Sequence, residues 1–176
     1  ASRLGEVTVP KPEKEQSKLC DFIGTEHGFS KVEAGHIDRT DFMHSVAKLS
    51  QKNLKRLRKT PHNGGGRIAW KDDEELQLPC YIGKDTWKTP SSTITTNFVK
   101  ISSGRFGHPE EDRGLSIREG ATLQTFPKTY IFKAQSLGAN ARLIGNAVPP
   151  EYARRLGILL NEEKHNGAIQ NESKSS

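Results

Sequence analysis

The sequence predicts a mixed α/β chain of the α+β kind, in which short elements are separated by loops and one well-formed helix comes last. Three observations lead to this fold class: short helical patterns bounded by capping residues and prolines, a run rich in β-branched residues, and an amphipathic segment after two consecutive prolines. Only 32% of the 176 residues are hydrophobic, and the mean hydropathy is -0.71. Such a lean composition suggests disordered ends or a buried face that another polypeptide completes.

The first helix and the strand are expected in the first two thirds of the chain. The helix should cover residues 50–59, SQKNLKRLRK, because Ser50 is a suitable N-cap and Pro61 ends the pattern. Residues 92–101, STITTNFVKI, are rich in β-branched side chains and are expected to form a strand.

Two further helices are expected toward the C-terminus. Residues 116–124, SIREGATLQ, begin with Ser116 and Glu119 at the spacing of a capping box. Residues 149–160, PPEYARRLGILL, place apolar side chains on one helical face, and prolines are well tolerated in the first turn of a helix. Just before them, Gly145 is expected to permit a tight turn.

The two ends of the chain differ in composition from the middle. Residues 1–18 are polar and contain two prolines, so they are expected to form a leader or linker. Residues 161–176 have little apolar content and are expected to be a disordered tail beyond about Lys164.

The charge of the chain favours an acidic partner, most simply nucleic acid. The formal net charge is +6 and the isoelectric point about 9.4. The basic residues concentrate in residues 48–71, where no acidic residue occurs. Their long side chains suit the phosphates of a duplex, although a solvated helix face would look the same. The candidate phosphate contacts are Lys52, Lys55, Arg56, Arg58, Lys59 and Arg67.

Several classes of protein are disfavoured. Cys20 and Cys80 are too few for a disulfide framework, and no cysteine and histidine cluster has the spacing of a zinc site. No apolar run reaches membrane length, and no signal peptide is recognisable. We therefore expect a cytoplasmic protein that uses neither a membrane nor a metal ion.

Two segments together resemble a known family. RGLSIREGATLQTFPKTY, followed by RLIGNAVPPEYARRL, resembles the last two motifs of the DNA cytosine-5 methyltransferases. In that family an Arg-Glu pair precedes Leu-Gln-x-Phe-Pro, and Gly-Asn-Ala-Val-Pro-Pro follows roughly two dozen residues later. STITTN and GRFGHP are also similar to the segment ahead of these motifs in many bacterial members. The resemblance covers about residues 48–160.

The resemblance implies a division of the chain into functional parts. Residues 19–140 would be a small target-recognition domain that binds double-stranded DNA. Residues 141–160 would be a turn and helix that pack on a Rossmann-like catalytic domain and complete its S-adenosylmethionine pocket. Asn146 and Ala147 would border that cofactor.

The resemblance also implies roles for single residues. Arg118 and Glu119 would anchor the recognition domain, Gln124 and Phe126 would fix the following turn, and Gly145 would form the hinge. Polar and aromatic residues between about positions 71 and 105 could reach base edges in the major groove. The candidates are Trp87, Thr95, Asn97 and Arg105.

The family motifs that carry the chemistry are missing from this sequence. It contains no Phe-x-Gly-x-Gly, no Pro-Cys-Gln and no Glu-Asn-Val. The reaction needs a thiolate that attacks C6 of a flipped cytosine and a glutamate that holds N3. Cys80 follows a proline, but Tyr81 stands where the family has glutamine. No catalytic residue is therefore expected in this chain.

The chain is accordingly expected to be inactive by itself and to act with a catalytic methyltransferase polypeptide that carries the earlier motifs. It would be the smaller subunit of a split heterodimeric enzyme of a restriction-modification system, or a piece of a longer enzyme. A stand-alone nucleic-acid-binding module and a regulatory protein derived from a methylase remain the alternatives.

Overall fold

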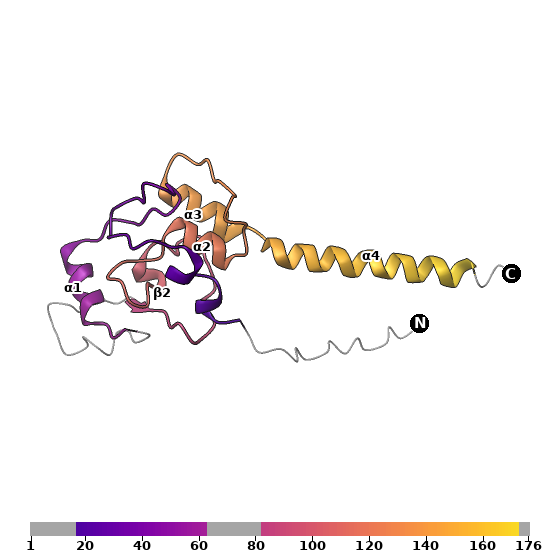
Figure 1. Ribbon diagram of the computed structural model, residues 1–176, viewed down its shortest axis with the longest axis horizontal. Helices are drawn as coiled ribbons and strands as arrows, with labels where there is room; N and C mark the ends of the chain where they lie inside the picture. Colours follow the sequence, from indigo (N-terminus) through magenta and orange to yellow (C-terminus); the bar gives the residue numbers. More distant parts are fainter. Residues whose placement is uncertain (1–16, 63–81, 173–176) are drawn as a thin grey trace, which may run out of the picture.

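The computed structural model describes residues 17–62 and 82–172 (Figure 1). The described part is a mixed α/β structure with a two-stranded sheet, so the predicted fold class is confirmed. The elements are the 3-10 turns η1 (Leu19–Asp21), η2 (Thr25–His27) and η5 (Ile101–Ser103), the strands β1 (Ile82–Lys84) and β2 (Gly104–Gly107), and the helices α1 (Gln51–Lys59), α2 (Ile117–Leu123), α3 (Leu137–Asn146) and α4 (Pro150–Glu172).

A serine side chain caps the N-terminus of each of three helices. Ser50 accepts a hydrogen bond from the Asn53 amide at the start of α1, and Ser116 forms a complete capping box with Glu119 at the start of α2. Both predicted helices are confirmed. Ser136 caps α3 in the same way, but α3 was not predicted.

The predicted turn at Gly145 and Asn146 is wrong, because both residues lie in the last turn of α3. The chain leaves the helix only at Ala147, whose backbone is extended. Gly145 is not among the glycines with positive φ, so it does not serve a left-handed turn.

The predicted strand over residues 92–101 is also wrong. The sheet instead pairs β1 with β2 in parallel, with Ile82 opposite Gly104. Residues 96–99 form a turn, in which the Phe98 amide donates to the Thr95 carbonyl at 3.2 Å. Ile94, Phe98 and Ile101 are buried, so the apolar and β-branched residues of this segment serve the core rather than a strand.

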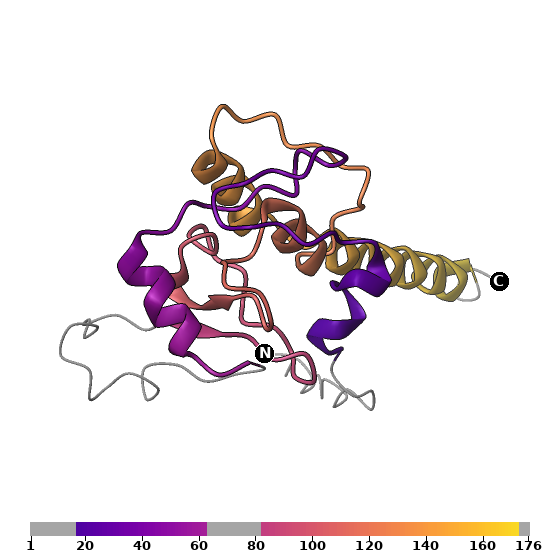
Figure 2. The same cartoon turned by 60° about the vertical axis from the view of Figure 1, so that its left-hand side comes forward.

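The main core joins segments from both ends of the described chain. Leu19 and Ile23 near the N-terminus pack into one cluster with Phe98, Ile117 and Ile144. A smaller cluster of Leu57, Ile82 and Ile101 holds α1 against the sheet. α2 packs on α3 within the main core (Figure 2).

The last helix projects away from this body in both views (Figures 1 and 2). It begins at Pro150, close to the predicted start, and its backbone stays helical through Glu172, past the predicted end of order at Lys164. The apolar side chains of residues 152–160 are exposed, including Tyr152 at 62% and Leu159 at 58%. The helical face expected to pack on a catalytic domain is therefore uncovered in this chain.

Candidate functional site

A buried ion pair stands at the centre of the loop that leads into α2. The Arg113 guanidinium donates to both carboxylate oxygens of Glu119 at 2.8 Å, and both side chains are 1% exposed. Arg113 also binds Glu111 through Nε at 3.0 Å. Glu119 accepts in addition from the Ser116 amide at 2.8 Å, so the capping box and the ion pair share one carboxylate. A fork of donors on a planar guanidinium suits this arrangement.

The charges of this pair are strongly stabilised. Burial alone would raise the pKa of Glu119, but the hydrogen bonds and the charge of Arg113 overcome it and hold the pKa at about 2. For Arg113, burial opposes the charge, yet the hydrogen bonds to Glu119 and Glu111 raise its pKa above the ordinary value. Neither group changes its charge near neutral pH, which suits a structural role rather than proton transfer.

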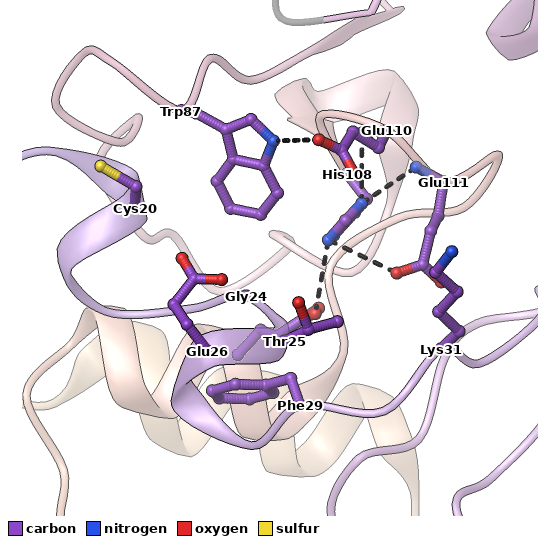
Figure 3. A pocket seen from close by; sticks show the side chains of 11 residues that line it. Cys20, Gly24, Thr25, Glu26, Phe29, Lys31, Trp87, His108, Glu110 and Glu111 are labelled. Atoms are coloured by element: carbon purple, nitrogen blue, oxygen red, sulfur yellow. Dashed lines mark hydrogen bonds and ion pairs between the residues drawn. The ribbon is translucent and has the colours of Figure 1, made fainter.

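His108 lies beside this pair at the back of a cavity of about 270 Å³ (Figure 3). Its Nδ1 accepts hydrogen bonds from the Glu110 and Glu111 amides at 3.3 and 3.0 Å, so Nε2 carries the hydrogen of the neutral ring. The carboxylates of Glu111 and Glu119 are 3.7 and 3.9 Å from Nε2. Burial nevertheless outweighs their attraction and lowers the pKa of His108 to about 4.

The same cavity contains Trp87, a candidate base contact. The indole nitrogen donates to Glu110 at 2.8 Å, and the ring packs edge-on against His108, 5.4 Å between centroids. Glu26, Glu110 and Glu111 line this cavity. Their carboxylates disfavour a phosphate there, and Trp87 points into this acidic cavity (Figure 3).

Arg118 fastens a different segment to α2. Its Nε and Nη2 donate to the Asp41 carboxylate at 2.6 and 3.1 Å, and its Nη1 donates to the Tyr130 carbonyl at 2.8 Å. Burial would raise the pKa of Asp41, but the bonds to Arg118 lower it below the ordinary value. Arg118 thus joins the loop before α1 to the loop after α2. Nothing in the sequence pattern identified Asp41, because it lies 77 residues from Arg118.

The connection between α3 and α4 is held from the end of α2. Gln124 donates through Nε2 to the Ala147 carbonyl at 2.9 Å. Phe126 packs against Phe132 with 4.9 Å between ring centroids. Gly145 allows close approach: a Cβ there would lie 2.4 Å from the Thr95 carbonyl carbon. Asn146, next to this connection, is exposed.

The basic candidates of α1 do not all lie on the same side. Lys52, Lys55, Arg58 and Lys59 are exposed, and Arg58 pairs with Asp112 at 3.4 Å. Arg56 is only 2% exposed and donates to Asn53. In this structure Arg56 is turned inward beside Leu57, so the exposed lysines of α1 are better placed for phosphates than Arg56 is.

The remaining candidate base contacts lie on the segment before α2. Thr95, Asn97 and Arg105 are exposed, and Arg105 donates to the Ser92 hydroxyl at 3.3 Å. Arg67 and Cys80 lie outside the described residues. Arg113 was missed as a functional candidate; the only available signal was its position six residues before the capping-box glutamate.

Two kinds of site are missing from the described residues. Within residues 17–62 and 82–172, no group of three His, Cys, Asp or Glu side chains is placed to hold a metal ion. Among the helices described, none is long and apolar enough to cross a membrane.

Comparison with known proteins gives a consistent match. A family model described as C-5 cytosine-specific DNA methylase matches residues 4–160. The chain is 37% identical over 129 residues to the type II methylase M.HgiDII of Herpetosiphon aurantiacus, covering 65% of this chain and 35% of that protein. It is 32% identical over 126 residues to the type II methyltransferase M.Sau96I of Staphylococcus aureus, covering 64% and 28%.

A third relative is matched over a longer stretch. The chain is 31% identical over 163 residues to the type II methyltransferase M1.HphI of Haemophilus parahaemolyticus, covering 86% of this chain and 39% of that protein. The chain thus spans well under half the length of these three relatives.

Proposed function

This chain belongs to the family of C-5 cytosine-specific DNA methylases, and we propose that it is the DNA-recognition and cofactor-closing part of such an enzyme. The enzyme would transfer a methyl group from S-adenosylmethionine to C5 of a flipped cytosine in double-stranded DNA. One observation carries this proposal: the family match includes both final motifs, while the sequence contains no Pro-Cys-Gln and no Phe-x-Gly-x-Gly. The names of the relatives support a modification enzyme of a restriction-modification system.

The missing chemistry would come from a catalytic methyltransferase segment that carries the earlier motifs. The uncovered helix α4 supports a contact with such a segment, since Tyr152, Leu156, Leu159 and Leu160 are each at least 45% exposed. A run of exposed apolar side chains on one helix is typical of an interaction surface. Closing this surface against the catalytic segment would also explain the lean hydrophobic composition of the chain.

The cofactor, when bound, supplies the methyl group, and the part of this chain next to it would be the end of α3. Asn146 is exposed beside the α3 to α4 connection, and its amide offers both a donor and an acceptor. The Ala147 carbonyl already accepts a hydrogen bond from Gln124. Ala147 would therefore contribute only its methyl side chain to the wall of the cofactor pocket. These properties fit a residue pair that borders a polar ligand.

DNA would meet α1 and the exposed loop residues before α2, of which Thr95 lies against Gly145 near the α3 to α4 connection. The exposed lysines of α1 are suited to phosphates, and the exposed side chains Thr95, Asn97 and Arg105 are suited to base edges. Arg118 and the Arg113 to Glu119 pair would keep these two surfaces in a fixed relation, because they join the loops around α2. The chain would therefore position DNA while the catalytic segment performs the attack on C6.

Assembly with the catalytic segment tests this proposal. A polypeptide of the same family carrying Phe-x-Gly-x-Gly and Pro-Cys-Gln should form a one-to-one complex with this chain in sedimentation experiments. Leu156→Asp with Leu159→Asp should abolish the complex, because both place a charge in the apolar contact. Asn161→Asp, an exposed polar position of the same helix, is the matched control and should assemble normally.

The same assembly experiment distinguishes the split enzyme from a stand-alone nucleic-acid-binding module. A chain that binds DNA equally well with and without the aspartate substitutions, and that never associates with the catalytic segment, would be an independent nucleic-acid-binding module.

A further inference from the structure

The C-terminal end of α2 breaks a common rule of helix termination. The Phe126 amide donates to the Ala121 carbonyl and the Thr125 amide to the Thr122 carbonyl, both at 2.9 Å. These two bonds define a Schellman motif, in which the residue after the C-cap adopts the left-handed conformation and is usually glycine. Here it is Thr125, with φ at 67°. Among the described residues, no other non-glycine residue has positive φ.

A threonine at this place is strained, because its branched Cβ crowds the backbone in the left-handed region. Glycine would adopt the same conformation without this strain, and asparagine with less of it. A strained residue of this kind persists when surrounding interactions favour it. The side chain of Thr125 must therefore provide something that glycine lacks.

What it provides is a cap for another helix. The Thr125 hydroxyl accepts a hydrogen bond from the Glu151 amide at 3.1 Å, in the first turn of α4. The first backbone bond of α4 runs from the Ala153 amide to the Pro149 carbonyl, so Pro149 is the N-cap residue. Neither Pro149 nor Pro150 has a side chain that can accept a hydrogen bond. A local cap is impossible, and Thr125 supplies it from 26 residues away.

The preceding residue holds the other side of the same connection. Gln124 donates to the Ala147 carbonyl at 2.9 Å, before Pro149, and Thr125 accepts from the Glu151 amide, after it. Two consecutive side chains thus bind the segment that links α3 to α4. Beyond these two contacts α4 projects from the body (Figure 1), and the side chains of residues 152–162 are exposed. Both hydrogen bonds thus act at or just before the first turn of the helix.

We propose that Thr125 is a positioning residue that fixes the direction in which α4 leaves the recognition body, and hence how α4 meets the catalytic segment. The last step rests on the proposed function, whereas the fixed direction of α4 does not. The family pattern Leu-Gln-x-Phe-Pro leaves this position open, so the role belongs to this sequence rather than to the motif. The hydroxyl group is the one feature of Thr125 that glycine could not supply at this strained position.

Three substitutions separate the hydroxyl from the backbone strain. Thr125→Val keeps the shape and loses the acceptor, Thr125→Gly relieves the strain and loses the acceptor, and Thr125→Ser keeps the acceptor. In the full chain, the distance between spin labels at Ser103→Cys and Asn161→Cys, with Cys20 and Cys80 replaced by serine, reports the direction of α4. Both labelled positions are exposed.

The expected result is one narrow distance distribution for the parent chain and for Thr125→Ser, and a clearly broader one for Thr125→Val and Thr125→Gly. Amide exchange at Glu151 should become about fivefold faster in Thr125→Val, as expected for a lost helix cap. Thr125→Gly should broaden the distribution without lowering the unfolding temperature, because the strain is relieved. An unchanged distribution in both Thr125→Val and Thr125→Gly would overturn the proposal.

The assembled enzyme tests the link to function. Thr125→Val should raise the KM for S-adenosylmethionine several-fold more than it lowers kcat, leave the affinity for DNA unchanged, and be rescued by Thr125→Ser. Broad distances with unaltered kinetics would refute the link to the cofactor site and leave the positioning of α4 established. Absence of methyl transfer in the parent complex would refute the proposed function, while the label distances would still decide the role of Thr125.

Discussion

Arg113 and Glu119 face each other across two hydrogen bonds of 2.8 Å, with 1% of each side chain exposed. The pair joins the loop after β2 to the first turn of α2, and the same carboxylate completes the capping box with Ser116. Removal of Arg113 would leave the buried Glu119 carboxylate without its cationic partner, whereas removal of Glu119 would leave Arg113 paired with Glu111 alone. The arrangement of the body around α2 therefore depends on this contact.

Arg113→Met should destabilise the fold by about 3–5 kcal/mol, the usual cost of breaking a buried ion pair from one side. The measurement is urea unfolding at neutral pH. Arg154→Met, which breaks an exposed pair with Glu151, is the control and should leave the urea midpoint nearly unchanged. Equal effects of the two substitutions would contradict a structural role for the Arg113 to Glu119 pair.

The stability of the fold should depend on pH through His108. Its pKa is about 4 in the folded chain, against an ordinary value of 6.5. Between these values the unfolded chain binds a proton that the folded chain does not, so stability is complete above pH 6.5 and falls as the pH drops toward 4. The slope should approach about 1.4 kcal/mol per pH unit within this window.

Urea unfolding at several pH values between 7 and 4 measures this effect. His108→Asn removes the titrating ring and retains an acceptor for the backbone amides, so its difference from the parent isolates the histidine from the carboxylates. A parent and variant with parallel pH profiles would show that His108 does not titrate as described.

Gly145→Ala and Gly138→Ala should have opposite effects on the same helix. A Cβ at Gly145 would meet the backbone of Thr95 and Thr96 at 2.4 Å, whereas a Cβ at Gly138 meets nothing within 4 Å. Gly145→Ala should therefore destabilise by about 1–3 kcal/mol through overpacking. Gly138→Ala should stabilise by up to about 1 kcal/mol through helix propensity. The unfolding temperatures of the two variants measure these effects, and a Gly145→Ala variant more stable than the parent would contradict the prediction.

Binding of DNA by the assembled enzyme should separate the two faces of α1. Lys52→Ala with Lys55→Ala should weaken binding equally for cognate and non-cognate duplexes and lower the salt slope by about one unit per lost phosphate contact. Arg56→Ala should instead lower the unfolding temperature, since that side chain is buried. If Arg56→Ala reduced the salt slope in a fully folded protein, the phosphate-binding face of α1 would be the one that carries Arg56 and not the one that carries the lysines.

Base recognition should respond differently to substitution. Asn97→Ala and Arg105→Ala should reduce discrimination between matched and mismatched duplexes by about 1–3 kcal/mol per lost bidentate contact, with nearly the same salt slope. Salt titrations on both duplexes measure the two effects together. A uniform loss of affinity on both duplexes would place these side chains on phosphates instead.

Local signals predicted the parts of the fold that depend on neighbouring residues. The serine caps at Ser50 and Ser116 gave the starts of α1 and α2, because each side chain bonds an amide three residues ahead. The apolar run after Pro149 predicted the start of α4. Composition and charge indicated only a nucleic-acid partner, whereas the family resemblance indicated a role in DNA methylation.

The remaining features depend on contacts between distant residues. Segment 92–101 contains the residues of a strand but is held as a turn by burial of Phe98 beneath Gly120, where a Cβ would lie 2.2 Å from the ring. Nothing near Arg56 in the sequence indicates its burial, and nothing near Arg118 identifies Asp41. Local patterns cannot reveal such partners, since the fold alone brings them together.

Transfer of a labelled methyl group from S-adenosylmethionine to duplex DNA tests the central claim most directly. The pure chain should transfer none, because it lacks the Pro-Cys-Gln nucleophile. Addition of the catalytic segment should produce 5-methylcytosine at a defined sequence, and the same segment alone should not. Methylation by the pure chain that is lost in Cys80→Ala would contradict the account, since the nucleophile would then lie in this polypeptide.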